Sequence, residues 1–270
     1  MLPEPENEPK RLRTRTGAPA RRGVSPGRVV AITLAFSVLL IASIYVFHRL
    51  EQFLIRDPRF ALSGVEGDPA AIEIAGASHA SREQIERVFS IDLGRSVYLL
   101  PLADRRDSLR TVDWVKDASI ARLWPNRVMV RVQERKPVAF LSLAPARFAL
   151  IDEDGVILPP ATDRFTLPVL TGVRASDSIE TRHDRVHRML RLTTDLGENV
   201  RNISEIDVSD RDNLKVTVPR DGHIVTLLLG DRGFAQRYDN FLNHFGEIKR
   251  KLPNAATLDL RLEDRITVVE

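Results

Sequence analysis

Few side chains in this 270-residue sequence are spaced for chemistry. The strongest candidate is His183-Asp-Arg-Val-His187, because two histidines four residues apart share one face of a helix and can hold a zinc ion. Asp184 would stand where zinc proteases use a longer glutamate as general base. The other histidines show no ligand spacing, so the pattern favours a solvated helix face.

The acidic run Asp152-Glu153-Asp154-Gly155 is a second candidate, in this case for calcium. A calcium loop needs more oxygen ligands over about a dozen residues and a distal glutamate, so we interpret the run as the turn of a hairpin. The chain has no cysteine, and Ser142, Ser204 and Ser209 lie in no nucleophile elbow. The sequence predicts no enzyme, no metal site, no cofactor and no small-molecule substrate.

Charge is distributed unevenly along the chain. Residues 1–28 hold seven Lys and Arg against three acids, whereas the remaining 242 residues carry 33 basic and 34 acidic side chains. The formal net charge of +3 is therefore a property of the tail. The body has no excess positive charge that would attract nucleic acid.

A membrane segment follows the tail. Val29 to Phe47 is a run of 19 residues without a charge, which as a helix measures about 28 Å and spans a hydrocarbon core. Its length, and the lack of a cleavage pattern after it, favour an uncleaved anchor over a signal peptide. Basic residues stay in the cytoplasm, so residues 1–28 are expected to be a disordered cytoplasmic tail near anionic inner-membrane lipid. Residues 48–270 would then lie outside, with 48–68 a linker or an extension of the helix.

Residues 69–137 have the order β-α-α-β-β. The expected elements are a strand over 71–76, helices over 82–90 and 103–112, and a hairpin of strands over 115–122 and 127–134. Ser81 opens a capping box before the first helix. Val128, Val130 and Val132 alternate on the last strand, so one face of that strand should cover the two helices.

Residues 138–270 are rich in strand patterns. Helices are expected over 176–197, capped by Ser176 or Asp177, and over 231–252, where apolar residues recur at three and four. The expected strands include a late one over 256–262. The fold class is therefore α+β, with a single transmembrane helix, a β-α-α-β-β module and a second β-rich domain that contains two helices.

The segment WVKDASIARLWPNRVMVRVQERKPVAF, from Trp114 to Phe140, is similar to the pattern of the FtsQ/DivIB family of bacterial cell division proteins. Its W-V-K start, R-L-W-P-N turn, alternating strand ending in glutamate and later Pro-Val-Ala carry the resemblance. The order of basic tail, membrane helix, POTRA domain and second β-rich domain resembles the same family over residues 28–270. A POTRA domain packs two helices on one face of a three-stranded sheet.

The resemblance implies a non-enzymatic scaffold of the divisome, which is anchored in the inner membrane, enriched at the division septum and active in assembling and regulating septal wall synthesis. It implies that a strand of FtsB, acting with FtsL, adds to an open sheet edge of the second domain. The candidate contacts are Leu258, Asp259, Leu260, Arg261 and Leu262. Many members of the family have an aromatic residue where this chain has Leu262. The resemblance also implies a recruitment surface around Arg122, Trp124 and Pro125.

Three alternatives stay open on the residues alone. A POTRA protein could instead act as a chaperone for outer-membrane clients, although the chain shows no repeat of the module. His183 and His187 could belong to a membrane-anchored metalloprotease. The basic cluster Arg127, Arg131, Arg135 and Lys136 could be a solvated face, a docking patch or the hinge between the two outer domains.

Overall fold

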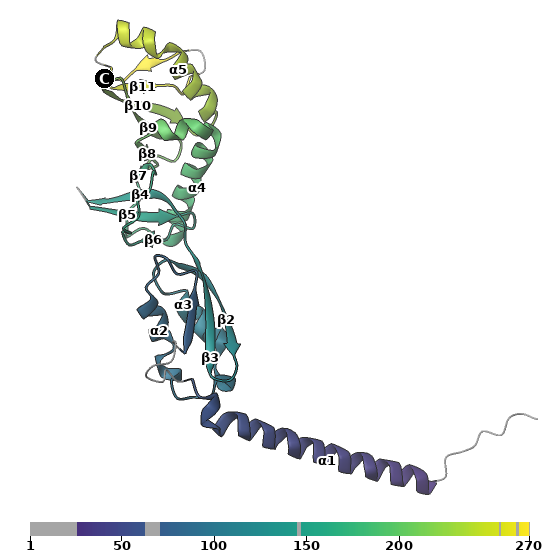
Figure 1. The fold of residues 1–270 in the computed structure, drawn as a ribbon. Helices are drawn as coiled ribbons and strands as arrows, with labels where there is room; N and C mark the ends of the chain where they lie inside the picture. Colours follow the sequence, from purple (N-terminus) through teal and green to yellow (C-terminus); the bar gives the residue numbers. More distant parts are fainter. Residues whose placement is uncertain (1–25, 63–70, 145–146, 254, 263–264, 270) are drawn as a thin grey trace, which may run out of the picture. The chain divides into compact units, whose positions relative to one another are not determined.

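A computed structural model describes residues 26–62, 71–144, 147–253, 255–262 and 265–269. They divide into two units, one that ends at Arg56 and one that begins at Asp57. The first unit is the long helix α1 (Pro26–Arg56), and the second contains two sheets with their helices (Figure 1). The expected α+β class is confirmed, while nearly all of the expected tail lies outside the described residues.

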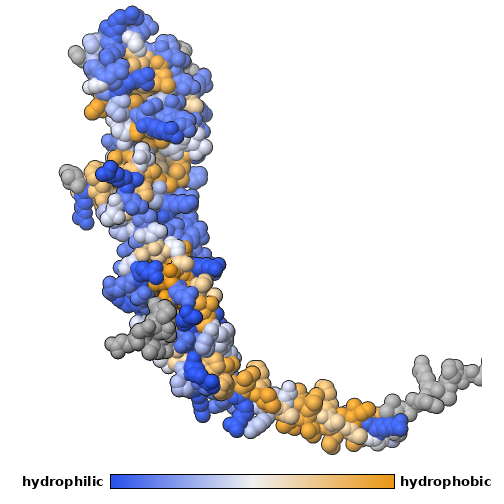
Figure 2. Space-filling model, viewed as in Figure 1, coloured by the Kyte–Doolittle hydropathy of each residue, from blue (hydrophilic) through white to orange (hydrophobic). Residues whose placement is uncertain are grey.

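Helix α1 has 31 residues and no buried side chain. In the part of the chain that the structure describes, it is the one helix long and apolar enough to cross a membrane. Its surface is mostly hydrophobic in the space-filling view (Figure 2). The helix continues nine residues beyond Phe47, so residues 48–56 are helical, and the short 3-10 helix η1 (Pro58–Phe60) follows. Residues 63–68 of the expected linker lie outside the described residues.

The first sheet forms the predicted β-α-α-β-β module. Its elements are β1 (Ile72–Ala75), α2 (Arg82–Val88), α3 (Leu102–Leu109), β2 (Val115–Leu123) and β3 (Arg127–Glu134), with 3-10 helices η2 (Ser90–Asp92) and η3 (Val97–Leu99) between α2 and α3. Strand β3 lies in the centre, parallel to β1 and antiparallel to β2. Val128 and Val130 are fully buried and Val132 nearly so, in one cluster with Ile85 and Leu109 from the helices. The prediction that the valine face covers the helices is confirmed.

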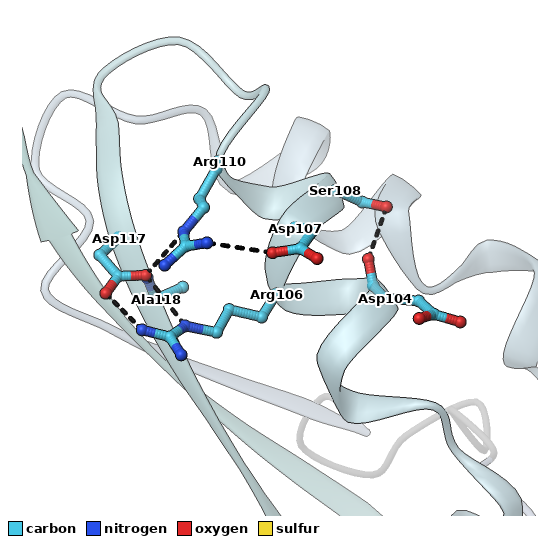
Figure 3. A network of polar contacts seen from close by, with 7 residues as sticks. All are labelled: Asp104, Arg106, Asp107, Ser108, Arg110, Asp117 and Ala118. Carbon is cyan, nitrogen blue, oxygen red and sulfur yellow. Dashed lines mark hydrogen bonds and ion pairs between the residues drawn. The ribbon is translucent and has the colours of Figure 1, made fainter.

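Local signals set the ends of these helices. The Ser81 hydroxyl accepts the N–H of Gln84 at 3.3 Å, which is the predicted cap. Helix α3 is tied to β2 by Asp117, whose carboxylate accepts bonds from Arg106 at 2.6 Å and Arg110 at 3.0 Å (Figure 3). These bonds, first of all those from Arg106, lower the pKa of Asp117 well below its usual range. Arg106 of α3, and Arg110 directly after it, therefore hold the helix against the sheet.

The second sheet has nine strands in the order β12-β11-β10-β9-β8-β7-β4-β5-β6. The strands are β4 (Pro137–Ala144), β5 (Arg147–Asp152), β6 (Ile157–Leu158), β7 (Val169–Thr171), β8 (Glu205–Asp207), β9 (Leu214–Arg220), β10 (His223–Gly230), β11 (Thr257–Asp259) and β12 (Thr267–Val268). Helices α4 (Ile179–Leu196) and α5 (Phe234–Lys251) contribute buried side chains to its core, and the 3-10 helix η4 (Gly197–Asn202) follows α4. The second β-rich domain with two helices is confirmed.

Three details of this domain differ from the sequence predictions. The cap of α4 is Ser178, whose hydroxyl accepts the N–H of Thr181, and neither Ser176 nor Asp177. The late strand expected over 256–262 is shorter and ends at Asp259, where the chain turns. Residues Thr267–Val268, which carried no strand prediction, form β12 and lie outside β11 at the end of the sheet.

Candidate partner-binding surfaces

The histidine pair of α4 offers no built metal site. The rings of His183 and His187 lie 6.1 Å apart between centroids. Within the described residues, no three His, Cys, Asp or Glu side chains come together in a group that could hold a metal ion. The described residues therefore do not supply the three ligands that a catalytic zinc ion needs.

The acidic run 152–155 is the turn of the β5–β6 hairpin, as predicted, and it contacts the first domain. The Asp152 carboxylate is 1% exposed; it accepts Nη1 of Arg135 at 2.6 Å and the backbone N–H of Val156 at 2.7 Å. Lys116 on β2 contacts Glu153 at 2.7 Å and Asp154 at 3.1 Å. Of the basic cluster, Arg135 thus lies at the junction between the two domains.

A second polar cluster joins the domains at His79. Its Nδ1 lies 2.9 Å from Glu134 and its Nε2 lies 2.9 Å from Asp163, which belongs to the loop between β6 and β7. The hydrogen bond to Glu134, with the one to Asp163, raises the pKa of His79 against the opposing effect of burial. The imidazole also stacks on Trp114, with ring centroids 4.5 Å apart.

Glu134, at the end of β3, anchors this cluster. Its Oε1 accepts the backbone N–H groups of Ser78, His79 and Ala80, each at 2.7 Å. Burial by itself raises the pKa of Glu134, but these N–H groups and His79 outweigh it, so the pKa is lowered. The carboxylate is therefore charged and bound at neutral pH.

Apolar side chains complete the junction. Leu150 and Leu158 of the β5–β6 hairpin are buried in the same cluster as Trp114 and Val132 of the first domain. We expect such a seam, combined with the two polar clusters, to limit rotation of one domain against the other.

The expected recruitment residues have different roles. The Nε–H of Arg122 bonds to the carbonyl of Val97 and its Nη2–H to that of Leu100, both at 2.7 Å. The guanidinium is therefore hydrogen-bonded to both ends of the η3 segment. Trp124 is 52% exposed and packs edge-on against Phe60, with ring centroids 5.8 Å apart. Pro125 follows it in the β2–β3 turn through a cis peptide bond. Of the three, Trp124 is the large apolar side chain that is exposed, and the recruitment role stays a prediction.

The carboxy-terminal edge of the second sheet is β12, not β11. Strand β11 lies between β10, to which it is parallel, and β12, to which it is antiparallel. The N–H of Val269 bonds to the carbonyl of Thr257 at 3.1 Å, so the neighbouring pair Leu258 and Val268 is a non-hydrogen-bonded pair. The N–H and C=O of Val268 consequently point away from β11, toward the open side of the sheet.

The five candidate contacts divide into three groups. Leu258 and Leu260 are each 1% exposed and belong to the core beneath α5, so their side chains do not face a partner. Asp259 and Arg261 pair with each other at 2.6 Å, and the Arg261 carbonyl accepts Nη2 of Arg237 at 2.9 Å. This pairing, first of all the hydrogen bond from Arg261, lowers the pKa of Asp259. Leu262 is 52% exposed and is the one of the five with an accessible apolar side chain.

Two hollows adjoin this edge along α5. Leu262 lines one of about 630 Å³ together with Arg237 and Asn240. Ile266, just before β12, lines another of about 270 Å³ with Ile248 and Leu252. The smaller hollow offers side chains of an added strand three apolar contacts, whereas the larger one is lined mainly by polar side chains apart from Leu262.

Sequence reasoning missed the two features that shape these surfaces. The β-branched run Thr267-Val268-Val269 carries the signal of an edge strand, although its shortness hides it. His79 and Glu134 gave no signal, because they are 55 residues apart in the sequence and meet only in the fold.

Comparison with known proteins agrees with this architecture. Residues 69–135 match the family model for the FtsQ-type POTRA domain, and residues 139–261 match that for the carboxy-terminal domain of cell division protein FtsQ/DivIB. Cell division protein FtsQ of Koribacter versatilis is 31% identical over 97% of this chain and 78% of the relative. That of Caulobacter vibrioides is 31% identical over 59% of this chain and 55% of the relative. That of Bradyrhizobium diazoefficiens is 27% identical over 81% and 62%, respectively.

Proposed function

The chain belongs to the FtsQ/DivIB family of cell division proteins, and from that premise we propose that it is a non-enzymatic scaffold of the divisome. It crosses the inner membrane once through α1 and binds FtsB and FtsL outside that membrane. Through these partners it helps to assemble and regulate septal cell-wall synthesis.

The proposed orientation depends on charge. Seven Lys and Arg precede or begin α1 within the first 28 residues, against Arg49, Arg56 and Arg59 soon after its apolar run. The excess of basic residues on the amino-terminal side favours a cytoplasmic tail. Both folded domains would then lie on the outer side, where septal wall is built.

The observation that carries the binding proposal is the open edge at β12. This strand has two residues, both exposed, and the peptide groups of Val268 point outward. A strand of FtsB would bond to these groups and continue the sheet by one strand. Because β12 is the outermost strand, β11 would support the edge, and β12 would pair with the partner.

Side chains would add selectivity to this pairing. An added strand points alternate side chains to the α5 side of the sheet, where Ile266, Ile248 and Leu252 line the smaller hollow. Leu262 lies at the larger one. Two interactions stabilise the turn that places Leu262 at the surface. They are the ion pair of Asp259 with Arg261 and the hydrogen bond from Arg237 to the Arg261 carbonyl.

Site-specific photo-crosslinking in dividing cells tests the proposal. The crosslinker is placed at Leu262 or Val268, and at Ile224, which is 70% exposed near the start of β10, as a control. We expect one small membrane-anchored partner at the first two positions and not at Ile224. Diverse outer-membrane chains at all three positions would instead support the chaperone alternative.

Val268→Pro separates backbone pairing from side-chain contact. Proline removes an N–H that points away from β11, so the pairing of β12 with β11 should persist. We expect partner capture to fall about fivefold or more, since one backbone hydrogen bond contributes about 1 kcal/mol, and cells to divide poorly. Val268→Ala keeps the N–H and should retain most of the capture. Equal behaviour of the two variants would argue against strand addition.

A further inference from the structure

An apolar patch lies on the first domain away from the β12 edge. It consists of the exposed large side chains of Ile91, Leu93, Tyr98, Leu99 and Trp124. Their exposed fractions run from 36% at Tyr98 to 67% at Ile91. Four of the five lie within nine residues of sequence, in and between η2 and η3, so this short segment concentrates apolar surface that the domain core does not use.

Hydrogen bonds fasten this segment to the point where the chain enters the domain. The N–H of Leu62 bonds to the carbonyl of Arg95, and the N–H of Gly94 bonds to the carbonyl of Leu62, both at 2.8 Å. The Leu62 side chain is fully buried in the domain core. Residues 93–96 therefore cannot move away from residue 62 without breaking a core contact.

The β2–β3 turn lies at this same end of the sheet. The Trp124 ring contacts Phe60, which is two residues before Leu62. Arg122 bonds to the carbonyls of Val97 and Leu100, and so joins the turn to the η3 segment. The five side chains of the apolar patch are thus held around one short stretch, residues 60–62.

The covalent chain keeps this stretch close to the bilayer. Helix α1 has 31 residues and measures about 46 Å, close to the roughly 40–45 Å of a bilayer with its headgroups. Leu62 follows the last residue of α1 by six positions, which an extended chain covers in about 20 Å at most. The apolar patch is therefore within reach of the lipid surface on the side where α1 ends.

Charge around the apolar patch also suits lipid. Asp92, the carboxylate of this segment, is 1% exposed and is bound by Arg105 at 2.5 Å. The Arg95 side chain is 55% exposed, and its contact with Asp92, at 3.7 Å, is longer than that of Arg105. The Arg59 side chain, in the segment that leads into the domain, is 72% exposed and pairs with Asp57 at 2.8 Å. The surface thus offers the Arg95 cation, the exposed Arg59 of an ion pair, a tryptophan and a tyrosine, residue types that favour the headgroup layer.

We propose that the apolar patch is a lipid-binding surface that inserts into the headgroup layer of an anionic membrane. Leu93, Leu99 and Trp124 leave water, while Arg95 and Arg59 contact headgroup phosphates. This contact would set the first domain on the membrane and so fix the height and direction at which the second domain presents its β12 edge. It requires that α1 crosses the membrane, and it is independent of strand addition at β12.

The two tryptophans of the chain make a label-free test possible. Trp124 is half-exposed in the apolar patch, whereas Trp114 is 3% exposed at the junction with the second domain. The full chain is placed, one copy per disc, in lipid nanodiscs of phosphatidylethanolamine and phosphatidylglycerol, with or without a nitroxide quencher on the acyl chains. We expect the quencher to reduce the emission of Trp124 and not that of Trp114. The emission of the Trp124→Phe variant, which comes from Trp114 alone, should therefore be the same with and without the quencher.

Two charge variants and a matched control sharpen the result. Leu93→Asp places a carboxylate in the apolar patch at an exposed position, so folding should be unaffected. It should lower the quenched population about tenfold or more, since burying one leucine side chain favours the inserted form by about that factor. Ile224→Asp, at an exposed position in the second domain, should change nothing. Arg95→Glu should weaken quenching in these discs, and should leave it unchanged in matched discs whose phosphatidylglycerol is replaced by zwitterionic phosphatidylcholine.

Three outcomes would overturn the proposal. The first is Trp124 emission that is the same with and without the quencher. The second is quenching that Leu93→Asp leaves unchanged, which would indicate nearness to lipid without insertion. The third is a crosslink from position 93 to a protein in cells, combined with no quenching of Trp124 in discs. This result would assign the apolar patch to a protein partner.

Discussion

The two ends of the three-stranded sheet differ in kind. At the end next to β4, His79, Glu134 and Arg135 form short, directional bonds to groups of the second domain or to the backbone, and little of their polar surface is left exposed. At the other end, around the β2–β3 turn, Trp124 and Leu93 are about half exposed. The module therefore has one closed end and one open end.

This difference indicates what each end contacts. Hydrogen bonds and ion pairs require a fixed geometry, which a covalently linked domain provides. Exposed apolar side chains need no fixed geometry and suit a partner such as a lipid surface. The same three-stranded sheet thus meets a structured neighbour at one end and, by our proposal, a fluid one at the other.

The largest expected contrast is between the two tryptophans. Trp114→Ala removes a buried ring that stacks on His79, and we expect it to lower the free energy of unfolding by about 3–5 kcal/mol. Trp124→Ala loses only the edge contact with Phe60 and should cost about 1 kcal/mol. Urea unfolding of the detergent-solubilised full chain, followed by circular dichroism, measures both. Equal losses would remove the distinction between closed and open ends.

Two arginines test the closed end in a similar way. Arg135→Ala leaves the buried carboxylate of Asp152 without its ion pair and should cost about 3 kcal/mol or more. Arg127→Ala, at the first residue of β3, breaks a pair with Glu73 in which both side chains are about 40% exposed, and should cost less than about 1 kcal/mol. The same unfolding measurement applies. If Arg127→Ala cost as much as Arg135→Ala, burial at the junction would not be the reason for the loss.

A smaller effect is expected from pH. The pKa of His79 is raised in the folded chain, mainly by Glu134, so protonated His79 stabilises the fold. The stabilisation is fully present below the unfolded value near 6.5 and is lost as pH rises through the raised folded pKa. His79→Gln does not titrate, so the difference in unfolding free energy between it and the unmodified chain should shrink with rising pH in that window. A constant difference would contradict the bridge to Glu134 and Asp163.

The smallest expected effect lies at the rim of the junction. Lys116 pairs with Glu153 and Asp154, but all three side chains are at least a third exposed. Lys116→Ala should therefore change the free energy of unfolding by less than about 1 kcal/mol, and less still at high salt. If Lys116→Ala lowered the free energy of unfolding as much as Arg135→Ala, the exposed ion pairs would stabilise the closed end as much as the buried one does.

Much of the fold could be predicted because local patterns carry it. The uncharged run of α1, the valine alternation on β3, the Ser81 cap and the turn at Asp152 each depend on residues a few positions apart. The order of elements in both domains follows from these patterns. The candidate binding edge was predicted only to within one strand, because a two-residue strand carries too little periodicity to recognise.

The sequence by itself determined which segments are helix or strand, and which side chains alternate on each. Only the tertiary structure decided which strand is the outermost and which groups meet across the junction. Leu258 and Leu262 look equivalent in the sequence, yet one is buried beneath α5 and the other is exposed, because the chain turns after Asp259. His79 and Asp163 come together over 84 residues. Such pairings depend on how whole elements pack, since no local energy term links residues so far apart in the chain.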